Sequence, residues 1–587
     1  MILVFGGTTE GRKAVEVLEE AGNTYYYSTK TGEQDITLHN GKRIDGALDY
    51  DAMVEFCKEN DIRIIVDAAH PFASQLHNTI VKVSETLQVP VIRYERIYPP
   101  RDNSITWIDD YSNIPHDIDS MLATTGVQSI AKLKPFEAEG IRIYYRILNR
   151  ESSIDLALRQ GASKEQLCYY DNPNDIPIKA DAILLKESGI TGGFVEKVEA
   201  AKALGMRIIA LKRPAIAKSF ITVNGPYGLR RAVEKLLPEF YPLHSGLTTG
   251  TCATAAAVAE AMRLTKGETP NEVPVLLPDG ETIKVAVGYG EGYAYCIKEA
   301  GDDPDVTDGI EVRASIILQH RDTETQGVII KGGEGVGRFT LPGFDYPPEE
   351  AAINKAPREM IQQNLERLCI SESLCSNNII VTISVPQGAE IARKTFNPRL
   401  GIEGGISIIG VSGIVKPFSE EAFIDSIRKC MTVAKASGSE RVVINSGGKS
   451  ERFVKGLYPT LPQQTFVEYG NYIGETLKIA NELDFKAVTL GVMLGKAVKL
   501  AAGNLDTHSR KSVMDKAFIQ QMLNEVGCDI DISNITLARE IWEKLPEDKL
   551  SIFAKTIINH CADYCKPLLP NGNLTIMLID DDGNIYQ

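Results

Sequence analysis

The sequence predicts a multidomain α/β protein, with a pair of parallel-sheet domains, then an α+β domain and a further α/β domain. Three observations support this fold class. The chain has 587 residues, which is too many for one hydrophobic core. Short apolar runs alternate with amphipathic stretches over the first 240 residues, as in parallel sheets covered by helices. After about residue 406 the order of strand, glycine turn and helix returns.

The N-terminal elements follow from the apolar pattern. Amphipathic spacing predicts helices over Gly11–Ala21 and Gly193–Leu204. Each expected strand is a short run of apolar, mostly aliphatic side chains. The expected strands are Ile2–Phe5, Ile62–Val66, Val89–Ile92, Ile141–Tyr145, Ala182–Lys186 and Arg207–Leu211.

The C-terminal part begins after a change of composition. Prolines and a glycine in Pro238–Gly246 indicate a linker. A small-residue helix over Ala253–Met262 and a hairpin turn at Pro278–Gly280 follow it. The strand Val442–Asn445 before a glycine turn predicts a later α/β domain, and we expect a terminal hairpin around Asp580–Gly583. The expected domains span 1–125, 126–240, 241–405 and 406–587.

Composition excludes several classes of function. A net charge of −15 argues against general nucleic-acid binding, which needs a basic footprint. No apolar run is long enough for a membrane span, and the first strand is not a signal peptide. The ten cysteines form no CxxC pair, so we expect reduced thiols and a cytoplasmic protein. Cys561 and Cys565 follow His560 at helical spacing, and we interpret them as helix residues rather than metal ligands. The sequence does not decide the oligomeric state, and a homo-oligomer is one of the possibilities.

The first strand ends in a glycine-rich turn, from Gly6 to Arg12. Backbone N–H groups at such a turn, with the helix N-terminus behind them, suit a pyrophosphate. The spacing is not G-x-G-x-x-G, so a tight turn without a ligand is the alternative. Hydroxyl and basic side chains after the second strand suit the 2′-phosphate of NADPH slightly better than the ribose of NADH. The predicted cofactor contacts are Gly6, Gly7, Thr8, Thr9, Glu10, Ser28 and Lys30.

A carboxylate and an imidazole follow another apolar strand, in Asp67–Ala73. The carboxyl end of a strand is where α/β proteins bind ligands, and Pro71 suits the first turn of a helix. We predict Asp67 and His70 as catalytic residues, with His70 positioning substrate or supplying a proton. The alternative is a helix-capping turn with a packed imidazole.

Together these motifs resemble the precorrin-6A reductase family over roughly residues 1–215. The resemblance implies two Rossmann-like halves around NADPH or NADH and hydride transfer to a macrocycle double bond. It also implies that Lys186 contacts substrate. The matching segments are Gly6–Arg12, Asp67–Ala73, Lys186–Gly189 and Lys212–Pro214.

A second set of motifs lies in the C-terminal part. The glycine-rich loop at Lys331–Arg338 lacks the Gly-Lys-Ser/Thr of a P-loop. With its arginine it can hold carboxylates instead. The run Ala392–Ile402 places three cations beside further glycines, and Lys499–Asn504 leads into Asp506–Arg510.

In this order the segments resemble the cobalt-precorrin-5B (C1)-methyltransferase family over about residues 245–587. The resemblance implies S-adenosylmethionine (SAM) as methyl donor, ring carbon 1 as acceptor, and release of acetaldehyde. His508 would act as acid or base, the alternative being a buried, hydrogen-bonded histidine. The predicted contacts to the carboxylate-rich macrocycle are Arg338, Arg393, Lys394 and Arg399, and those to SAM lie in the turns of Gly447, Gly448 and Gly470.

The two families catalyse consecutive steps of corrin-ring (cobalamin) synthesis, so the sequence predicts a bifunctional enzyme acting on cobalt-precorrin tetrapyrroles. Two alternatives come from other classes of protein. One is a corrinoid-binding protein in which only the methyltransferase half is active. The other is a small-molecule kinase, suggested by the glycine-rich loop near residue 335.

Overall fold

The computed structural model describes residues 1–587 except 31–33, 171, 173–174, 321–326 and 370–376. It divides into two compact units. Unit 1 comprises Met1–His244 with Asp279–Lys284, and unit 2 comprises Ser245–Pro278 with Val285–Gln587. In the described part of the chain no helix combines the length and the apolar character needed to cross a membrane.

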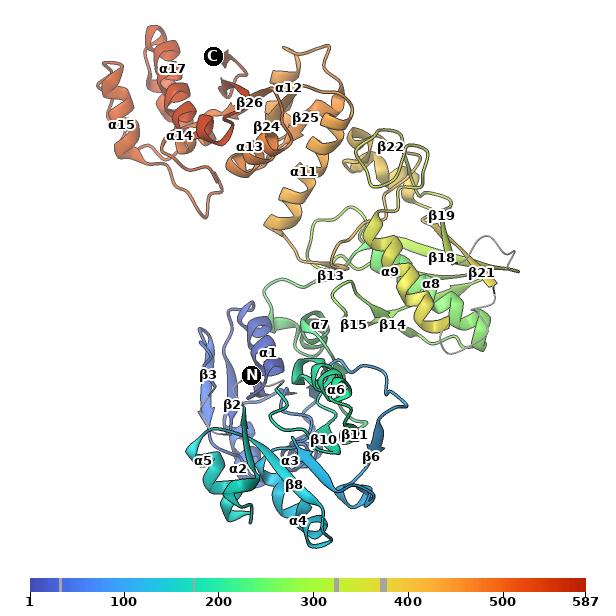
Figure 1. Ribbon diagram of the computed structural model, residues 1–587. Coiled ribbons are helices and arrows are strands. Elements are labelled where there is room, and N and C mark those ends of the chain that lie inside the picture. The colour runs from blue at the N-terminus through green and yellow to red at the C-terminus, as the bar shows by residue number, and fades with distance from the viewer. Residues whose placement is uncertain (31–33, 171, 173–174, 321–326, 370–376) are drawn as a thin grey trace. The chain divides into compact units, whose positions relative to one another are not determined.

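The first sheet of unit 1 has six parallel strands in the order β12-β5-β4-β1-β2-β3. Its central strands are almost wholly apolar because helices flank the sheet (Figure 1). The strands are β1 (Ile2–Phe5), β2 (Tyr25–Thr29), β3 (Gly41–Asp45), β4 (Ile64–Asp67), β5 (Val91–Tyr94) and β12 (Ile221–Val223). The helices are α1 (Thr9–Glu19), α2 (Tyr50–Glu59), α3 (Ser74–Leu87) and α7 (Pro226–Leu236).

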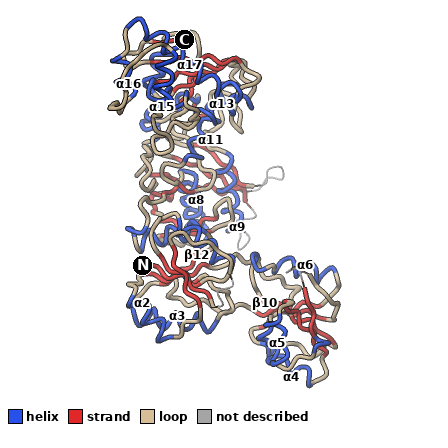
Figure 2. Tube along the Cα trace, turned by 90° about the vertical axis from the view of Figure 1, so that its left-hand side faces the viewer, coloured by secondary structure: helices blue, strands red, loops and turns tan. Residues whose placement is uncertain are grey.

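The second sheet of unit 1 is also parallel, in the order β6-β11-β10-β7-β8-β9. Figure 2 shows it as a lobe separate from the first sheet. Its strands are β6 (Thr106–Ile108), β7 (Ser120–Ala123), β8 (Arg142–Leu148), β9 (Leu167–Tyr170), β10 (Ala182–Lys186) and β11 (Arg207–Leu211). Its helices are α4 (Ile130–Ala138), α5 (Glu151–Arg159) and α6 (Phe194–Ala203).

The chain crosses between the two sheets of unit 1 twice. β6 belongs to the second sheet although it precedes residue 125, and β12 belongs to the first sheet although it follows the second lobe. The segment Asp279–Lys284 also packs with this unit, where the buried carboxylate of Glu281 accepts hydrogen bonds from the N–H groups of Tyr227 and Gly228 at the start of α7. Sequence periodicity alone did not reveal these exchanges, because it carries no information on sheet order.

The first helix of unit 2 is α8 (Thr249–Lys266), whose alanine-rich turns are buried so that the sheet can approach closely. The mixed sheet beside it has the order β16-β17-β18-β21-β19. Its elements are β16 (Gly288–Gly290), β17 (Tyr293–Ile297), β18 (Glu311–His320), β19 (Val328–Gly332), α9 (Lys355–Cys369) and β21 (Asn377–Ser384). Pairs of short strands also occur, namely β13 (Gly246–Leu247) with β23 (Ile414–Val415), β14 (Glu272–Leu276) with β15 (Thr282–Ala286), and β20 (Arg338–Phe339) with β22 (Ile402–Glu403).

The last sheet has the order β25-β24-β26-β27-β28 and is parallel except for β28. Its strands are β24 (Arg441–Asn445), β25 (Phe466–Glu468), β26 (Ala487–Met493), β27 (Asn573–Ile579) and β28 (Ile585–Tyr586). Its helices are α11 (Glu420–Ala436), α12 (Gly448–Lys455), α13 (Ile473–Glu482), α14 (Leu494–Ala501), α15 (Lys516–Glu525), α16 (Ala538–Lys544) and α17 (Glu547–Cys565). The predicted fold class, with two parallel sheets followed by α+β and α/β regions, is confirmed.

Candidate functional site

The switch point of the first sheet lies between β1 and β4, because the chain leaves β1 towards one edge and β4 towards the other. The parallel register pairs Phe5 with Asp67 there. Gly7 has a φ of +86° in the turn after β1. The Thr8 hydroxyl donates to the Ala68 carbonyl over 2.7 Å. The two predicted motifs, Gly6–Arg12 and Asp67–Ala73, therefore lie side by side.

Several groups of the glycine turn already have partners. The Gly7 N–H donates to the Tyr27 hydroxyl and to Gln34 Oε1, each over 3.1 Å. Gly6 is required for close packing, because a Cβ there would lie 2.1 Å from the Tyr27 hydroxyl oxygen. The space beside the Gly7 Cα is open, and Thr9 is exposed. A flat, anionic ligand can therefore approach this turn from the Gly7–Thr9 side.

Glu10 lies in the turn but its carboxylate is engaged elsewhere. Arg96 Nε donates to Glu10 Oε2 over 2.9 Å, and the Thr191 hydroxyl donates to Oε1. Burial raises the pKa of Glu10, but the hydrogen bond from Thr191 and the charge of Arg96 together outweigh burial. The pKa of Glu10 is therefore lower than its usual value. Of the other predicted cofactor contacts, Ser28 is buried and Lys30 is exposed.

Asp67 is the centre of a buried polar network. Its side chain has no exposed surface. Arg93 Nη1 donates to Asp67 Oδ1 over 2.9 Å, and His77 Nδ1 lies 2.7 Å from Oδ2. His77 Nε2 in turn lies 3.1 Å from the His70 carbonyl oxygen. Because its oxygens are turned towards these partners, Asp67 fixes the backbone that carries His70. Neither His77 nor Arg93 was predicted, although His77 lies two turns after His70 at the start of α3.

His70 is half-buried beside a cavity. Burial lowers its pKa to about 3, and the charges of Arg96 and Lys186 act in the same direction. Nδ1 accepts a hydrogen bond from the Phe72 N–H over 3.2 Å, so the neutral ring carries its proton on Nε2. The imidazole is therefore a hydrogen-bond donor at neutral pH rather than a cation.

The cavity has a volume of about 380 Å³ and occupies the switch point of the second sheet, between β7 and β10. Lys186 lies at the end of β10, with Nζ 5.2 Å from the centroid of the Phe72 ring. Lys197, in the first turn of α6, donates to the Gly192 carbonyl over 2.9 Å. Burial lowers the pKa of both lysines, that of Lys197 to about 8. The lining residues are His70, Thr124, Thr125, Gly126, Leu185, Lys186, Ser188, Gly192 and Lys197.

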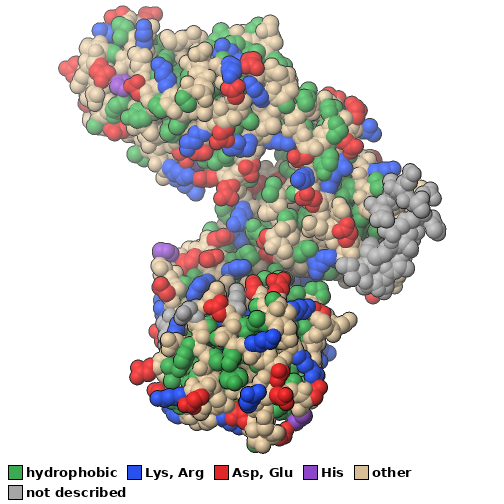
Figure 3. All heavy atoms as spheres, in the orientation of Figure 1, with side chains coloured by type: hydrophobic (Ala, Val, Ile, Leu, Met, Phe, Trp, Pro, Cys, Tyr) green, Lys and Arg blue, Asp and Glu red, His purple; other side chains and the backbone are tan. Residues whose placement is uncertain are grey.

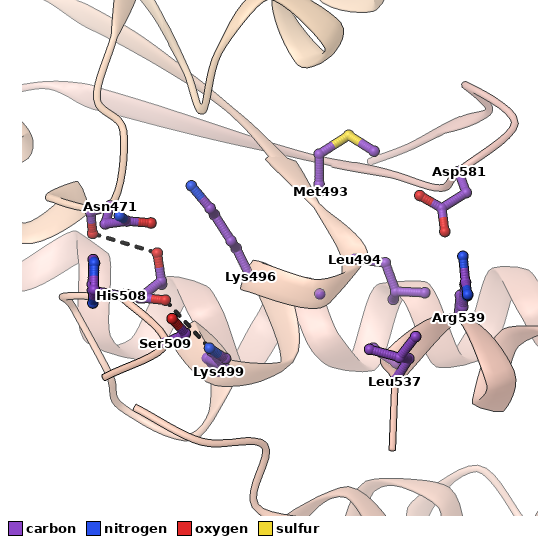
Figure 4. Close-up of a pocket in the computed structure, with 13 residues that line it drawn as sticks. Asn471, Met493, Leu494, Lys496, Lys499, His508, Ser509, Leu537, Arg539 and Asp581 are labelled. Carbon is purple, nitrogen blue, oxygen red and sulfur yellow. Dashed lines mark hydrogen bonds between the residues drawn. The ribbon is translucent and has the colours of Figure 1, made fainter. Parts of the chain in front are cut away.

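Unit 2 has a larger cavity, of about 510 Å³, at the carboxyl edge of its last sheet (Figure 4). Lys496 and Lys499 enter it from α14. His508 lies on its wall, with Nδ1 accepting from the Arg510 N–H over 3.1 Å. The lining residues are Asn471, Met493, Leu494, Gly495, Lys496, Lys499, Thr507, His508, Ser509, Leu537, Ala538, Arg539 and Asp581.

The four cations predicted to bind the macrocycle do not lie together in that cavity. Arg338 is exposed on β20, and Arg393 and Lys394 are exposed in a short 3₁₀ turn. Arg399 is half-buried and donates from Nη1 to Glu451 Oε2 over 2.7 Å. On the face drawn in Figure 3, Lys and Arg side chains are interspersed with Asp and Glu over the described surface, without a continuous basic patch.

The glycines of the loop at Lys331–Arg338 allow neighbouring backbone segments to pack closely. A Cβ at Gly335 would lie 1.8 Å from the Val385 carbonyl oxygen. The N–H of Gly333 donates to the Ile383 carbonyl, and that of Gly337 to Ile406. Because these N–H groups are used within the backbone, the loop is not a phosphate cradle, and the structure gives the kinase alternative no support.

The turns that were predicted to contact SAM lie at the carboxyl edge of the last sheet. Gly447 has a φ of +150° and its N–H donates to Asn445 Oδ1 over 3.1 Å. Gly448 begins α12. The Gly470 carbonyl, after β25, accepts a hydrogen bond from Lys496 Nζ. The Gly470 turn is therefore linked to the 510 Å³ cavity through Lys496.

Comparisons with known proteins divide the chain in the same way. Residues 1–226 match the family model of precorrin-6x reductase CbiJ/CobK, residues 238–417 match CbiD, and residues 506–587 match the C-terminal domain of CbiD. A cobalt-precorrin-5B C(1)-methyltransferase of Prosthecochloris aestuarii is 40% identical over 348 residues, which are 57% of this chain and 94% of the relative. One from Brucella canis is 42% identical over 314 residues, 52% of this chain and 84% of the relative.

Two solved structures are also similar. The cobalamin biosynthesis protein cbiD from Archaeoglobus fulgidus is 29% identical, with a TM-score of 0.27, covering 46% of this chain and 83% of that one. A CobK precorrin-6A reductase is 18% identical, with a TM-score of 0.33, covering 40% of this chain and 96% of that one.

The fold and the cavities define a chain of two α/β enzyme units. In unit 1 a ligand-sized cavity lies at the switch point of the second sheet, and in unit 2 one lies at the carboxyl edge of the last sheet. The chain belongs to the cobalt-precorrin-5B C(1)-methyltransferase family, CbiD, and carries an N-terminal precorrin-6x reductase region of the CbiJ/CobK family fused to it. Both predicted resemblances, and the fusion, are confirmed.

Proposed function

We propose that the chain catalyses two consecutive steps of corrin-ring synthesis. Unit 2 methylates carbon 1 of cobalt-precorrin-5B and releases acetaldehyde, and unit 1 reduces the resulting cobalt-precorrin-6A to cobalt-precorrin-6B. The observation that carries the proposal is the match to a cobalt-precorrin-5B C(1)-methyltransferase over 94% of that relative, joined to an N-terminal region, residues 1–226, that matches the reductase family model. The ranges 1–125, 126–240, 241–405 and 406–587 are proposed as functional regions, with β6 and β12 exchanged between the first two.

The reductase site is proposed in the region of unit 1 that carries both switch points. The space beside the Gly7 Cα is open, and Lys30 is exposed directly after β2, which fits a dinucleotide with a 2′-phosphate. When bound, the reduced nicotinamide supplies the hydride. Lys186 would pair with a substrate carboxylate, and neutral His70 would donate a hydrogen bond from Nε2. Asp67 is then a positioning residue, because it acts through the backbone of His70.

A proton must accompany the hydride when a carbon–carbon double bond is reduced. Lys197 is the candidate donor, because it lines the same cavity as His70 and burial brings its pKa down to about 8, close to neutral pH. His70 is less suited, because its pKa of about 3 leaves no imidazolium to give up a proton.

The methyltransferase site is proposed at the 510 Å³ cavity. When bound, SAM supplies the methyl group, and the chain's contribution is to align donor and acceptor. His508 would transfer a proton during release of the two-carbon fragment. Arg338, Arg393 and Lys394 are exposed and free to meet substrate carboxylates, whereas Arg399 is held by Glu451.

Coenzyme preference tests the placement of the reductase cofactor. In the Lys30→Ala variant we expect kcat/KM for NADPH to fall about tenfold, since a charge-assisted contact contributes about 1.5–3 kcal/mol. The kcat/KM for NADH should hardly change, because NADH has no 2′-phosphate. Steady-state rates with both coenzymes and cobalt-precorrin-6A measure this. An equal loss with both coenzymes would remove Lys30 from the 2′-phosphate site.

A further inference from the structure

The crevice at the switch point of the last sheet combines a glycine turn with an unpaired carboxylate. The chain leaves β24 towards β25 on one side and β26 towards β27 on the other, so the crevice lies between the carboxyl ends of β24 and β26. The turn at Ser446–Gly447 follows β24 and leads into α12, whereas α14 begins at Leu494 directly after β26. The space beside the Cα atoms of Gly448 and Gly495 is open.

Glu468 is the carboxylate at this crevice. It ends β25, is half-buried, and has no hydrogen-bond or ion-pair partner within the described ranges of the chain. Burial raises its pKa above the usual value, and the charges of Arg399 and Lys496 offset this only in part. A Cβ at Gly447 would lie 3.2 Å from Glu468 Oε1, so the carboxylate lies against the glycine turn. Glu468 was not predicted from the sequence. Its position about 20 residues after a glycine turn that ends a strand is the pattern that could have indicated a ribose-binding carboxylate.

Lys496 connects this crevice to the 510 Å³ cavity. Its Nζ donates to the Gly470 carbonyl, just beyond Glu468 on the chain, while its side chain lines the cavity (Figure 4). Burial lowers its pKa, which indicates that the ammonium lacks full solvation. The opposite wall carries Arg539 and Asp581.

The geometry points to a nucleoside subsite for the methyl donor, and this inference rests on the proposed methyltransferase function. Glu468 accepts hydrogen bonds from the ribose hydroxyls of SAM beside the Gly447 turn. Lys496 pairs with the carboxylate of its methionine part at the entrance of the cavity. An acidic side chain after the second strand, facing a glycine turn after the first, is how α/β crevices hold ribose.

The test uses calorimetry on the full-length chain with three probes: S-adenosylhomocysteine, its 2′-deoxy analogue, and adenosine. The wild type should bind S-adenosylhomocysteine about tenfold to hundredfold more tightly than the deoxy analogue, the range for a hydrogen bond to a charged group. Glu468→Gln should weaken S-adenosylhomocysteine by a similar factor and remove most of this discrimination. Lys496→Met should weaken S-adenosylhomocysteine but not adenosine, which has no carboxylate.

Glu482→Gln is the matched control, because Glu482 is an exposed carboxylate on α13 of the same region, and it should bind all three probes as the wild type does. Circular dichroism confirms that each variant is folded. If the Glu468→Gln variant discriminates between S-adenosylhomocysteine and its 2′-deoxy analogue as strongly as the wild type does, Glu468 does not bind the ribose. The methyltransferase proposal would still stand. If the wild type does not bind S-adenosylhomocysteine, the methyltransferase proposal itself fails.

Discussion

The Lys197→Met variant should lose reductase turnover by about 10²–10⁴-fold, the usual contribution of a positioned general acid. Methyl transfer by the same protein should be unchanged, because Lys197 belongs to unit 1. Lys197→Arg should keep KM near the wild-type value, since the positive charge remains, but should lose kcat. An arginine does not release a proton near neutral pH.

The pH dependence of kcat supplies the second readout for Lys197. The burial that lowers its pKa to about 8 leaves the ammonium protonated below that value, so the rate should fall as pH rises through about 8. Lys202→Met is the control, because Lys202 lies on the same helix and pairs with Asp102 at the surface. A Lys197→Met variant with raised KM, unchanged kcat and the same pH profile would make Lys197 a carboxylate anchor instead of a proton donor.

The largest effect on stability is expected at Asp67. Asp67→Ala should lower the free energy of unfolding of unit 1 by about 3–5 kcal/mol, because it leaves Arg93 buried without one of its partners. The His77 contact that holds the His70 carbonyl would also lose its anchor. Denaturant unfolding followed by hydrogen exchange in the β1 and β4 peptides measures the change.

Asp102→Ala is the matched control for Asp67, because its ion pair with Lys202 is exposed, and exposed pairs contribute little. It should leave the exchange of β1 and β4 unchanged. An Asp67→Ala variant with wild-type stability but no reductase activity would assign Asp67 to the chemistry rather than to positioning.

Local sequence patterns predicted the strands well where burial is complete. β1, β10 and β11 begin and end at the predicted residues, because strands buried on both faces are continuous apolar runs. The exchange of β6 and β12 between the two lobes could not be predicted, because both are three-residue strands with exposed or half-buried positions. Their assignment depends on tertiary pairing rather than on pattern.

In the candidate sites, too, local sequence patterns predicted some features, whereas others depend on tertiary contacts. The sequence placed the Gly6 turn and the Asp67 segment each after an apolar strand, and the pairing of β1 with β4 brings the two together. The roles of Glu10 and Asp67 did not follow from the sequence, because an ion pair with a residue distant in sequence, such as Arg96 or Arg93, leaves no local signal. Lys197 and Glu468 were missed for a related reason. Each lies in an ordinary helix or strand, and only the sheet order brings it to a crevice.

The most direct test of the account is to follow the mass of the macrocycle when the purified chain acts on cobalt-precorrin-5B. With SAM alone, the product should gain one methyl group and lose the two-carbon fragment as acetaldehyde. Addition of reduced nicotinamide should then add two hydrogens to the same macrocycle. Methylation without the later reduction would leave only the methyltransferase half active. A macrocycle that binds but keeps its mass under both conditions would contradict the two-enzyme account.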